Sequence, residues 1–494
     1  MQIQKQLSGG TFLAVLFVII AAGCKSEANK ANPVAKPDPS IAVLPFVNLG
    51  KEAGQEYFSN GLTEGILNSL SYLKGLKVSA PFSSFKFAGK NVDPKQVEKD
   101  LGVHAILEGS IQREADKVSI TAKLINTKDG TPYWSEKYDE KMDDIFSIQN
   151  RITSAIADKL EVTLINNKPT NSQKPPNIKA YDLYLKGRAS WNIGTPPELR
   201  KGIDFFQQAI AIDGSYAAAY SGIADCYTAL GYGSFLPPKE AFPKALEAAT
   251  KALQLDSTLA EPHASLGYYK FYYEWDWAAA EQEFRMAIAL NPNYALGYDW
   301  YGYYLTAMKR YDEADVILNK AADLDPLSAR IATDVGFTAY YRGNYDAAIE
   351  KLQKALKLNA HFPLALLWMG RTYQAKKMYT EAIKAYEDGI EFTPHWPVAV
   401  AQIGNIYGLL GKKIEAQKVL DTLSFLSQQM YVTSYGVALV DVGLGEVDKT
   451  FYWLNRSYEE RSHWLVWLKS DPRWIPLQGD KRFRELVNKV GLPN

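Results

Sequence analysis

The chain has 494 residues, of which 47% are hydrophobic and 22% charged, and its 55 Lys and Arg residues balance 55 Asp and Glu residues. This composition agrees with a folded protein, and the length leaves room for two or three compact units. The neutral balance excludes the broad basic surface that nucleic-acid binding needs, so we expect no nucleic-acid partner.

The amino terminus carries an export pattern. Lys5 precedes an apolar run over residues 11–22, which is too short to span a bilayer comfortably but suits the core of a secretory signal. The small residues directly before Cys24 resemble the box of bacterial lipoproteins, although Ala21 stands where that box usually has Leu. The resemblance implies a signal peptide over residues 1–24 and lipidation of Cys24; the alternative is a plain uncleaved anchor.

Residues 25–39 are polar and rich in Lys, Ala, Asn and Pro, a composition that predicts a flexible tether between a membrane and the first domain. Lys25 after the cysteine favours outer-membrane sorting under the usual enterobacterial rule. We therefore expect a protein of the bacterial cell envelope, lipid-anchored to a membrane, with the outer membrane favoured, and facing the periplasm or the cell surface.

Residues 40–163 predict a small α+β domain with the order β-α-β-α-β-β-β-α. A buried strand over residues 41–46 is followed by an amphipathic helix, a second strand, and a short helix opened by Asp93 and Pro94. Three antiparallel strands and a last helix from about residue 143 to 160 complete it. The sequences of residues 57–71, 103–126 and 133–153 resemble the small domain related to the amino-terminal part of the Tol-system protein TolB. The resemblance does not say what this domain binds.

A polar, proline-containing linker over residues 164–178 separates this domain from a repeating pattern. Junctions recur at Asp256, Asn291, Asp325, Asn359 and Thr393, and a glycine follows each of them eleven residues later. The intervals between these glycines are 35, 34, 34 and 34 residues. This period predicts stacked helical hairpins, each of which depends on its neighbours to bury its apolar face.

The small, large and turn positions of these units resemble the tetratricopeptide repeat, so we expect an all-α solenoid over residues 179–425. Small residues are expected where the two helices of a hairpin cross closely. They are Gly267, Gly302, Gly336, Gly370, Gly404, Ala314, Ala348 and Ala382.

In the family, certain positions of the inner helices line a concave, ligand-binding groove. The resemblance assigns to this groove Tyr268, Phe271, Tyr272, Tyr303, Phe337, Tyr340, Tyr341, Arg371, Gln374 and Asn405. Such an aromatic groove suits a protein or peptide segment, or a glycan face. The alternative is that some of these rings pack between repeats. A clamp for a C-terminal carboxylate is not expected, because only Arg330, Arg371 and Asn405 offer suitable groups and the lysines are missing.

Residues 426–494 predict a degenerate repeat and a C-terminal cap. Helix pairs are expected over residues 431–444 and 447–461, and the last segment resembles the terminus of TolB-like proteins that contain repeats. Trp464, Trp467, Trp474 and Phe483 are expected to cover the exposed end of the last hairpin. A role for these tryptophans in ligand binding is the alternative.

No pattern for catalysis, metal binding or a cofactor is recognisable in the sequence. The five histidines are scattered, and the acidic residues near Asp143 fit a helix start. We therefore expect a non-enzymatic envelope scaffold that binds a protein, peptide or glycan. The alternative is a sensory or regulatory subunit of a membrane kinase or adenylate cyclase system, and glycan hydrolysis by paired carboxylates ranks last.

Overall fold

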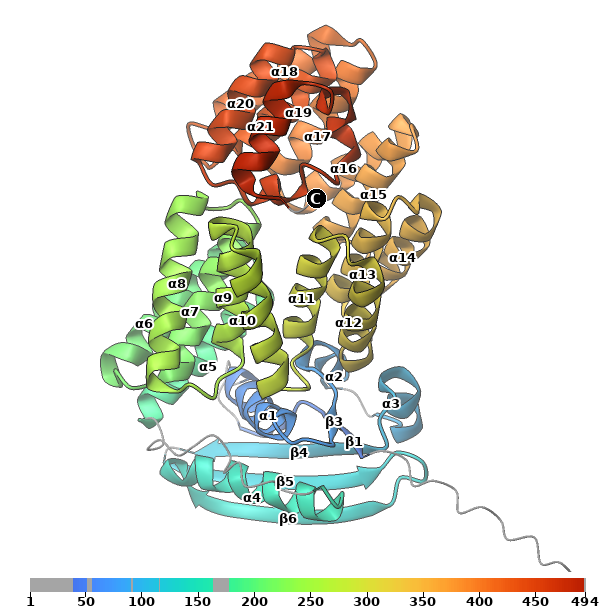
Figure 1. The fold of residues 1–494 in the computed structure, drawn as a ribbon. Helices are drawn as coiled ribbons and strands as arrows, with labels where there is room; N and C mark the ends of the chain where they lie inside the picture. Colours follow the sequence, from blue (N-terminus) through green and yellow to red (C-terminus); the bar gives the residue numbers. More distant parts are fainter. Residues whose placement is uncertain (1–38, 51–55, 90–91, 115, 163–176, 493–494) are drawn as a thin grey trace, which may run out of the picture. The chain divides into compact units, whose positions relative to one another are not determined.

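The computed structural model describes residues 39–50, 56–89, 92–114, 116–162 and 177–492 (Figure 1). The predicted signal peptide, Cys24, almost all of the tether and most of the linker lie outside these residues. The described chain begins with a small mixed sheet and continues as a long run of helices that forms a solenoid of the tetratricopeptide type. This confirms the predicted fold class.

The sheet has the strand order β3-β1-β4-β5-β6, and the short β2 also pairs with β4. β1 lies parallel to β3 and β4, whereas β4, β5 and β6 form an antiparallel meander. Helices α1 and α4 contribute apolar side chains such as Leu62 and Ile148 to the main core of the domain. The strands and helices are β1 (Ser40–Val43), β2 (Val47–Asn48), α1 (Glu56–Ser71), β3 (Lys77–Val78), α2 (Pro81–Phe85), α3 (Pro94–Leu101), β4 (Ala105–Glu114), β5 (Lys117–Asn126), β6 (Pro132–Lys141), η1 (Met142–Asp144) and α4 (Ile145–Lys159).

Helix α3 shows how local sequence sets an element boundary. Asp93 caps its first turn by accepting a hydrogen bond from the Lys95 amide, and Pro94 occupies the first turn, where no intrahelical donor is needed. Gly102 ends the helix in the left-handed conformation. The structure adds β2 and α2 to the predicted element order.

The repeats are antiparallel helix pairs stacked in sequence order. They comprise α5 (Ile178–Ile193), α6 (Pro196–Ile212), α7 (Ala217–Tyr232), α8 (Pro238–Leu255), α9 (Glu261–Tyr269) with its continuation η2 (Lys270–Glu274), α10 (Trp277–Leu290), α11 (Ala295–Ala307), α12 (Tyr311–Leu324), α13 (Ala329–Tyr341), α14 (Tyr345–Leu358), α15 (Pro363–Ala375), α16 (Tyr379–Phe392), α17 (Pro397–Leu409) and α18 (Lys413–Leu426). A further pair follows, α19 (Ser434–Leu444) and α20 (Val447–Glu459). The bounds of these two helices are close to the ranges 431–444 and 447–461 predicted from the sequence.

In the hairpins that begin with α9, α11, α13 and α15, a glycine of the first helix packs closely against a large side chain of the second. A Cβ atom at Gly302 would lie 2.5 Å from Leu318, and one at Gly370 would lie 2.4 Å from Tyr386. Both distances are shorter than van der Waals contact, so a larger residue would push the two helices apart. Ala314, Ala348 and Ala382 on the second helices are fully buried.

The junctions between repeats do more than end helices, because several of them hold the small domain. Asn293 donates to the Ser71 and Leu76 carbonyls, both at 2.9 Å, and accepts from the Val78 amide at 3.0 Å. Asn291 donates to the Ser71 hydroxyl at 2.9 Å. These bonds satisfy backbone groups around β3, a strand at the edge of the sheet.

A second junction binds α2 in the same way. The Asp325 carboxylate accepts hydrogen bonds from the Ser83 amide at 2.9 Å and the Ser83 hydroxyl at 2.5 Å. Burial raises the pKa of Asp325 to about 6, although the hydrogen bonds from Ser83 lower it. The repeat junctions therefore form a polar seat for the small domain.

We expect Asn293→Ala to lower the free energy of unfolding by about 2–4 kcal/mol, because it leaves a buried amide and two buried carbonyls without their partner. Urea denaturation of the full chain measures this loss. Asn359→Ala is the matched control. Asn359 is an exposed junction residue that caps only the His361 amide, so its loss should cost about 1 kcal/mol or less. Equal losses in the two variants would contradict the seating role of Asn293.

Candidate functional site

The inner helices of the repeats carry the ten residues that the sequence assigns to a partner-binding groove, and all ten are buried, with exposed fractions of 0–6%. They come from α9, η2, α11, α13, α15 and α17. These residues therefore do not line an open groove in this structure. The ten residues are covered by another part of the same chain, which the sequence predicted to form the cap at the end of the solenoid.

Residues 463–477, here called the C-terminal segment, cover the predicted groove. The segment consists of two short helical turns, η3 (His463–Trp467) and η4 (Pro472–Leu477). The Trp467 ring stacks on Tyr341 at a centroid distance of 4.5 Å and meets Phe337 edge-to-face at 4.9 Å. It also meets Phe271 edge-to-face at 6.3 Å. One side chain thus joins η2 to α13, and these aromatic contacts add to the gain from burying its area.

Arg371 lies between two rings of different origin. Its guanidinium carbon is 4.4 Å from the centroid of Trp368 on α15 and 4.6 Å from that of Trp464 in the C-terminal segment. The Arg371 Nε and Nη1 atoms are buried without a hydrogen-bond acceptor. Cation–π attraction is therefore a principal source of stabilisation for this buried charge.

The C-terminal segment also brings an ion pair into the interior. Arg473 donates through Nε to Asp471 at 2.8 Å and through Nη1 to the Gln402 side chain on α17. The Tyr435 hydroxyl donates to Asp471 at 3.1 Å. Burial acts to raise the pKa of Asp471, but the Arg473 and Arg371 guanidiniums outweigh it and hold that pKa below its ordinary value. Asp471 is therefore ionised at neutral pH.

The remaining predicted groove residues pack against their neighbours. The ring centroids of Tyr268 and Trp300 are 4.7 Å apart, and those of Tyr303 and Phe337 are also 4.7 Å apart. Gln374 donates to Asn405 at 2.5 Å. Packing of some rings between repeats, the alternative interpretation of the sequence, is thus observed, and a binding role for these residues stays a prediction.

The terminal aromatic residues divide into two groups. Phe483 on α21 (Lys481–Val490) and Trp474 are buried near the last helices, where Trp474 donates to the Tyr435 hydroxyl at 2.7 Å. Trp467 lies against Phe271, Phe337 and Tyr341 of earlier repeats, whereas Trp464 contacts both Arg371 on α15 and Tyr435 on α19. The prediction that all four cover the last hairpin is therefore wrong for Trp467.

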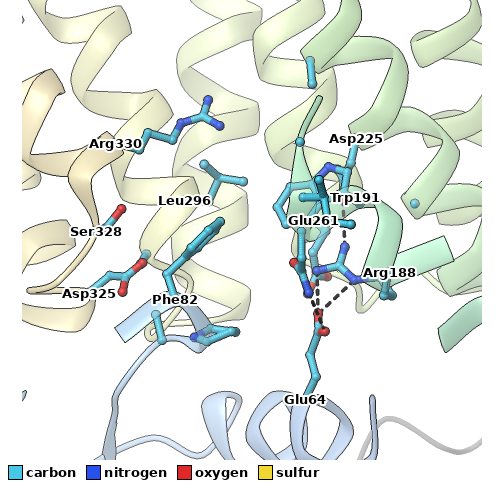
Figure 2. Close-up of a pocket in the computed structure, with 18 of the residues that line it drawn as sticks. Glu64, Phe82, Arg188, Trp191, Asp225, Glu261, Leu296, Asp325, Ser328 and Arg330 are labelled. Atoms are coloured by element: carbon cyan, nitrogen blue, oxygen red, sulfur yellow. Dashed lines mark hydrogen bonds and ion pairs between the residues drawn. The ribbon is translucent and has the colours of Figure 1, made fainter. Parts of the chain in front are cut away.

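A chamber of about 830 Å³ lies between the small domain and the repeats. Its lining includes α1 and α2 on one side and the first residues of α9, α11, α13 and α15 on the other. Figure 2 shows charged groups at both ends of the view, with Glu64, Arg188 and Asp225 together and Arg330 apart from them. Cavities of this size hold small organic ligands or short chain segments in other proteins.

The first charged group of the chamber is an internal network. Arg188 donates to Glu64 through Nε at 2.9 Å and through Nη2 at 2.6 Å, and its Nη1 lies 3.5 Å from Asp225. Ser265 donates to Asp225 at 3.0 Å. Burial raises the pKa of Asp225 to about 7, although Arg188 lowers it. The charges of this group therefore largely compensate one another.

The second group is less well compensated. Arg330 Nε lies 3.6 Å from Asp299, which is beyond hydrogen-bond distance, and Nε has no acceptor. Burial raises the pKa of Asp299 to about 6 and also raises that of Asp334. Tyr303 donates to Asp334 at 2.5 Å and accepts from Tyr232 at 3.1 Å. Hydrogen bonds thus connect Asp334 through Tyr303 to Tyr232, whose ring contacts His463.

Sequence reasoning missed the chamber. Arg330 was noted only as part of an incomplete carboxylate clamp, while Glu64, Phe82 and Arg188 belong to no recognisable motif. No signal in a single sequence places residues of α1 and α2 opposite the repeat junctions. The described residues contain no group of three or more His, Cys, Asp or Glu side chains placed to hold a metal ion. In the same part of the chain, no helix has the length and apolarity to cross a membrane.

Comparison with protein families supports the repeats directly. Residues 296–326 and 339–406 match two family models described as tetratricopeptide repeat. The chain therefore contains tetratricopeptide repeats, which generally act in protein interactions. These matches do not extend to the small domain or to the amino terminus.

Curated relatives match parts of the chain. A putative adenylate cyclase 3 of Rhizobium meliloti is 35% identical over 197 residues, which are 39% of this chain and 33% of that protein. The transcriptional regulator HilA of Salmonella typhimurium is 26% identical over 173 residues, 35% of this chain and 31% of HilA. The type IV pilus assembly protein PilF of Pseudomonas aeruginosa is 32% identical over 121 residues, 24% of this chain and 48% of PilF. The chain thus spans a third to a half of each relative.

Solved structures also match parts of the chain at low identity. The Cut9 and Hcn1 assembly of the APC/C gives a match with 15% identity and a TM-score of 0.44, covering 70% of this chain and 59% of that one. The structure of Pseudomonas aeruginosa PilF matches with 24% identity and a TM-score of 0.31, covering 42% of this chain and 94% of that one.

His463 provides a pH-dependent test of the closed groove. Burial and the nearby Arg371 guanidinium lower the pKa of His463 from 6.5 to about 3. The unfolded chain binds this proton more readily than the folded chain. The contribution of neutral His463 to stability is therefore complete above pH 6.5 and falls as the pH decreases towards 3.

His463→Phe retains a ring in contact with Tyr232 and Trp464 but cannot titrate. We expect the unfolding free energy of the wild type, relative to this variant, to fall by up to about 1.4 kcal/mol per pH unit below pH 6.5. Urea denaturation between pH 7.5 and 4.5 measures the slope. His361→Phe, at an exposed junction, should keep the wild-type slope. Parallel curves for the wild type and His463→Phe would disprove the burial of a neutral imidazole.

Proposed function

We propose that this protein is a non-enzymatic scaffold whose tetratricopeptide repeats bind an extended, aromatic-containing segment of a partner protein. One observation carries the proposal: the inner helices already hold a non-repeat segment, residues 463–477, through ring stacking and a few charged contacts. A surface that accepts this segment from its own chain has the chemistry to accept a similar one from another protein. A glycan face is a second ligand that stacked rings suit.

The partner segment would take the place of the C-terminal segment. Trp467 and Trp464 occupy the central contacts, and large rings in buried pockets dominate the binding energy of most interfaces. The C-terminal segment is tethered to the repeats, which gives it a high effective concentration. An external segment must therefore bind tightly or arrive when the tethered one is released.

The test is photocrosslinking in living cells with a benzophenone analogue of phenylalanine at position 341. In the resting chain, this side chain lies against Trp467 and should crosslink to residues 463–477. In a Trp467→Ala background, which removes the stacked ring, we expect crosslinks to shift to an aromatic-containing segment of a partner. Mass spectrometry identifies the crosslinked peptides, and circular dichroism shows whether the helices are retained.

Ile475→Ala is the matched background, since this side chain of the same segment is 61% exposed and should leave the crosslinks unchanged. The analogue at position 316, which is 69% exposed on α12, reports non-specific neighbours. The proposal fails when position 341 gives no intermolecular crosslink in the Trp467→Ala background. It also fails when positions 341 and 316 capture the same proteins.

We further propose that Cys24 is lipidated and holds the protein in the bacterial cell envelope, with the outer membrane favoured. The apolar run before Cys24 and the polar stretch after it support this location. Cells grown with labelled palmitate should incorporate the label into the wild-type chain, and Cys24→Ala should lose it. Cys226→Ala is the control, because Cys226 is buried in α7 and should not affect labelling. Label that persists in Cys24→Ala would exclude the anchor.

A second candidate function is regulation of a membrane signalling system. The similarity to part of a putative adenylate cyclase and to part of HilA favours it. In this alternative the chain acts as a sensory or regulatory subunit for a separate kinase or cyclase. Capture of such an enzyme at position 341 would favour this function over that of a general scaffold.

A further inference from the structure

The chamber between the small domain and the repeats carries a second inference, which is independent of the groove that residues 463–477 cover. Its lining carboxylates mostly have partners. Glu64 accepts from Arg188, Glu261 accepts from Tyr72 at 3.1 Å, and Asp325 accepts from Ser83. These contacts hold the three carboxylates in fixed positions, and Arg188 compensates the charge of Glu64.

Arg330 differs from the other lining residues. Its side chain is 30% exposed, and within the described residues neither Nη atom donates to any acceptor. The nearest carboxylate, Asp299, lies 3.6 Å from Nε, and burial raises the pKa of that carboxyl. Guanidinium N–H groups that face a cavity without an acceptor favour a carboxylate or phosphate ligand, which can accept two of them together.

The position of Arg330 in its helix adds to this preference. Arg330 is the second residue of α13, and the first residues of α9, α11 and α15 also line the chamber. The amino-terminal ends of helices carry partial positive charge. Lys86 lines the same chamber and forms no ion pair within the described residues. The helix ends and Lys86 therefore add positive potential to that of the Arg330 guanidinium.

An apolar surface lies next to Arg330. Phe82 on α2 is 48% exposed although it lines the chamber, and Leu296 on α11 lies nearby. Figure 2 shows the Phe82 ring directed into the chamber on the side of Leu296 and Arg330, away from the network of Glu64 and Arg188. A ligand that covers Phe82 removes apolar area from water, which is favourable in proportion to that area.

We propose that the chamber binds a small organic anion, with its carboxylate or phosphate on Arg330 and its alkyl or aromatic body against Phe82 and Leu296. The volume of about 830 Å³ accommodates such a molecule. The site combines a side chain of the small domain with one of the repeats, so it exists only where the repeat junctions seat that domain. This role requires no displacement of residues 463–477.

The test uses the purified full chain and four probes with the same eight-carbon tail: nonanoate, octyl phosphate, octanol and octyltrimethylammonium. Isothermal titration calorimetry should show saturable binding of at least one anion, about tenfold or more tighter than octanol or the cation. The tighter of the two anions distinguishes a carboxylate site from a phosphate site. Arg330→Gln should weaken binding of that anion by about tenfold or more and leave octanol binding unchanged.

Arg342→Gln is the matched control, because Arg342 follows the same helix but pairs with Asp312 and Asp315 outside the chamber lining. Phe82→Ala changes a half-exposed residue and should weaken binding of the anion and of octanol to the same extent. It provides the test even if Arg330→Gln unfolds, which circular dichroism would reveal. The proposal is overturned when neither anion binds saturably, when octanol or the cation binds as tightly, or when folded Arg330→Gln or Phe82→Ala binds like the wild type.

Discussion

The structure depends on one constraint: the aromatic side chains that the repeats place on their inner helices must be covered. Tyr341 and Phe337 lie on α13 and Phe271 lies on η2 of an earlier repeat, so no single hairpin can bury all three rings. Trp467 contacts the three rings at once and removes their faces from water. The C-terminal segment therefore belongs to the core of the solenoid, although it comes from outside the regular array.

The junctions between the repeats bind the small domain. The junction residues lie where helices end and backbone groups lack partners. Asn293 and Asp325 use this position to bind backbone groups around β3 and α2 of the small domain. Such bonds are directional, so they fix the orientation of the domain more closely than apolar contact does. The chamber with Arg330 follows from this geometry, because the domain rests on the ends of the helices and leaves space between them.

The regular part of the fold could be predicted from the sequence, since local spacing determines it. The period of 34 residues indicated the helix pairs, and the capping pattern at Asp93 and Pro94 matched the start of α3. The contact of Trp467 with Tyr341 could not be predicted, because it joins residues far apart in the chain and η3 follows no repeat. The sequence drew attention to Arg330, yet only the structure shows that its Nη atoms face a cavity lined by Phe82. Periodicity reports which side of a helix is apolar, but it does not report what covers that side.

The charged groups at the groove limit which segments can occupy it. Burying Arg371 and the pair Asp471 and Arg473 costs desolvation energy that a purely apolar contact would avoid. Arg371 offsets this cost through the faces of Trp368 and Trp464, and Arg473 offsets it through Asp471 and Gln402. A competing segment without a ring at the position of Trp464 would leave Arg371 buried and half covered. Hydrophobicity alone is therefore insufficient for binding in this groove, and the aromatic and charged groups of residues 463–477 define the chemistry that a competitor has to reproduce.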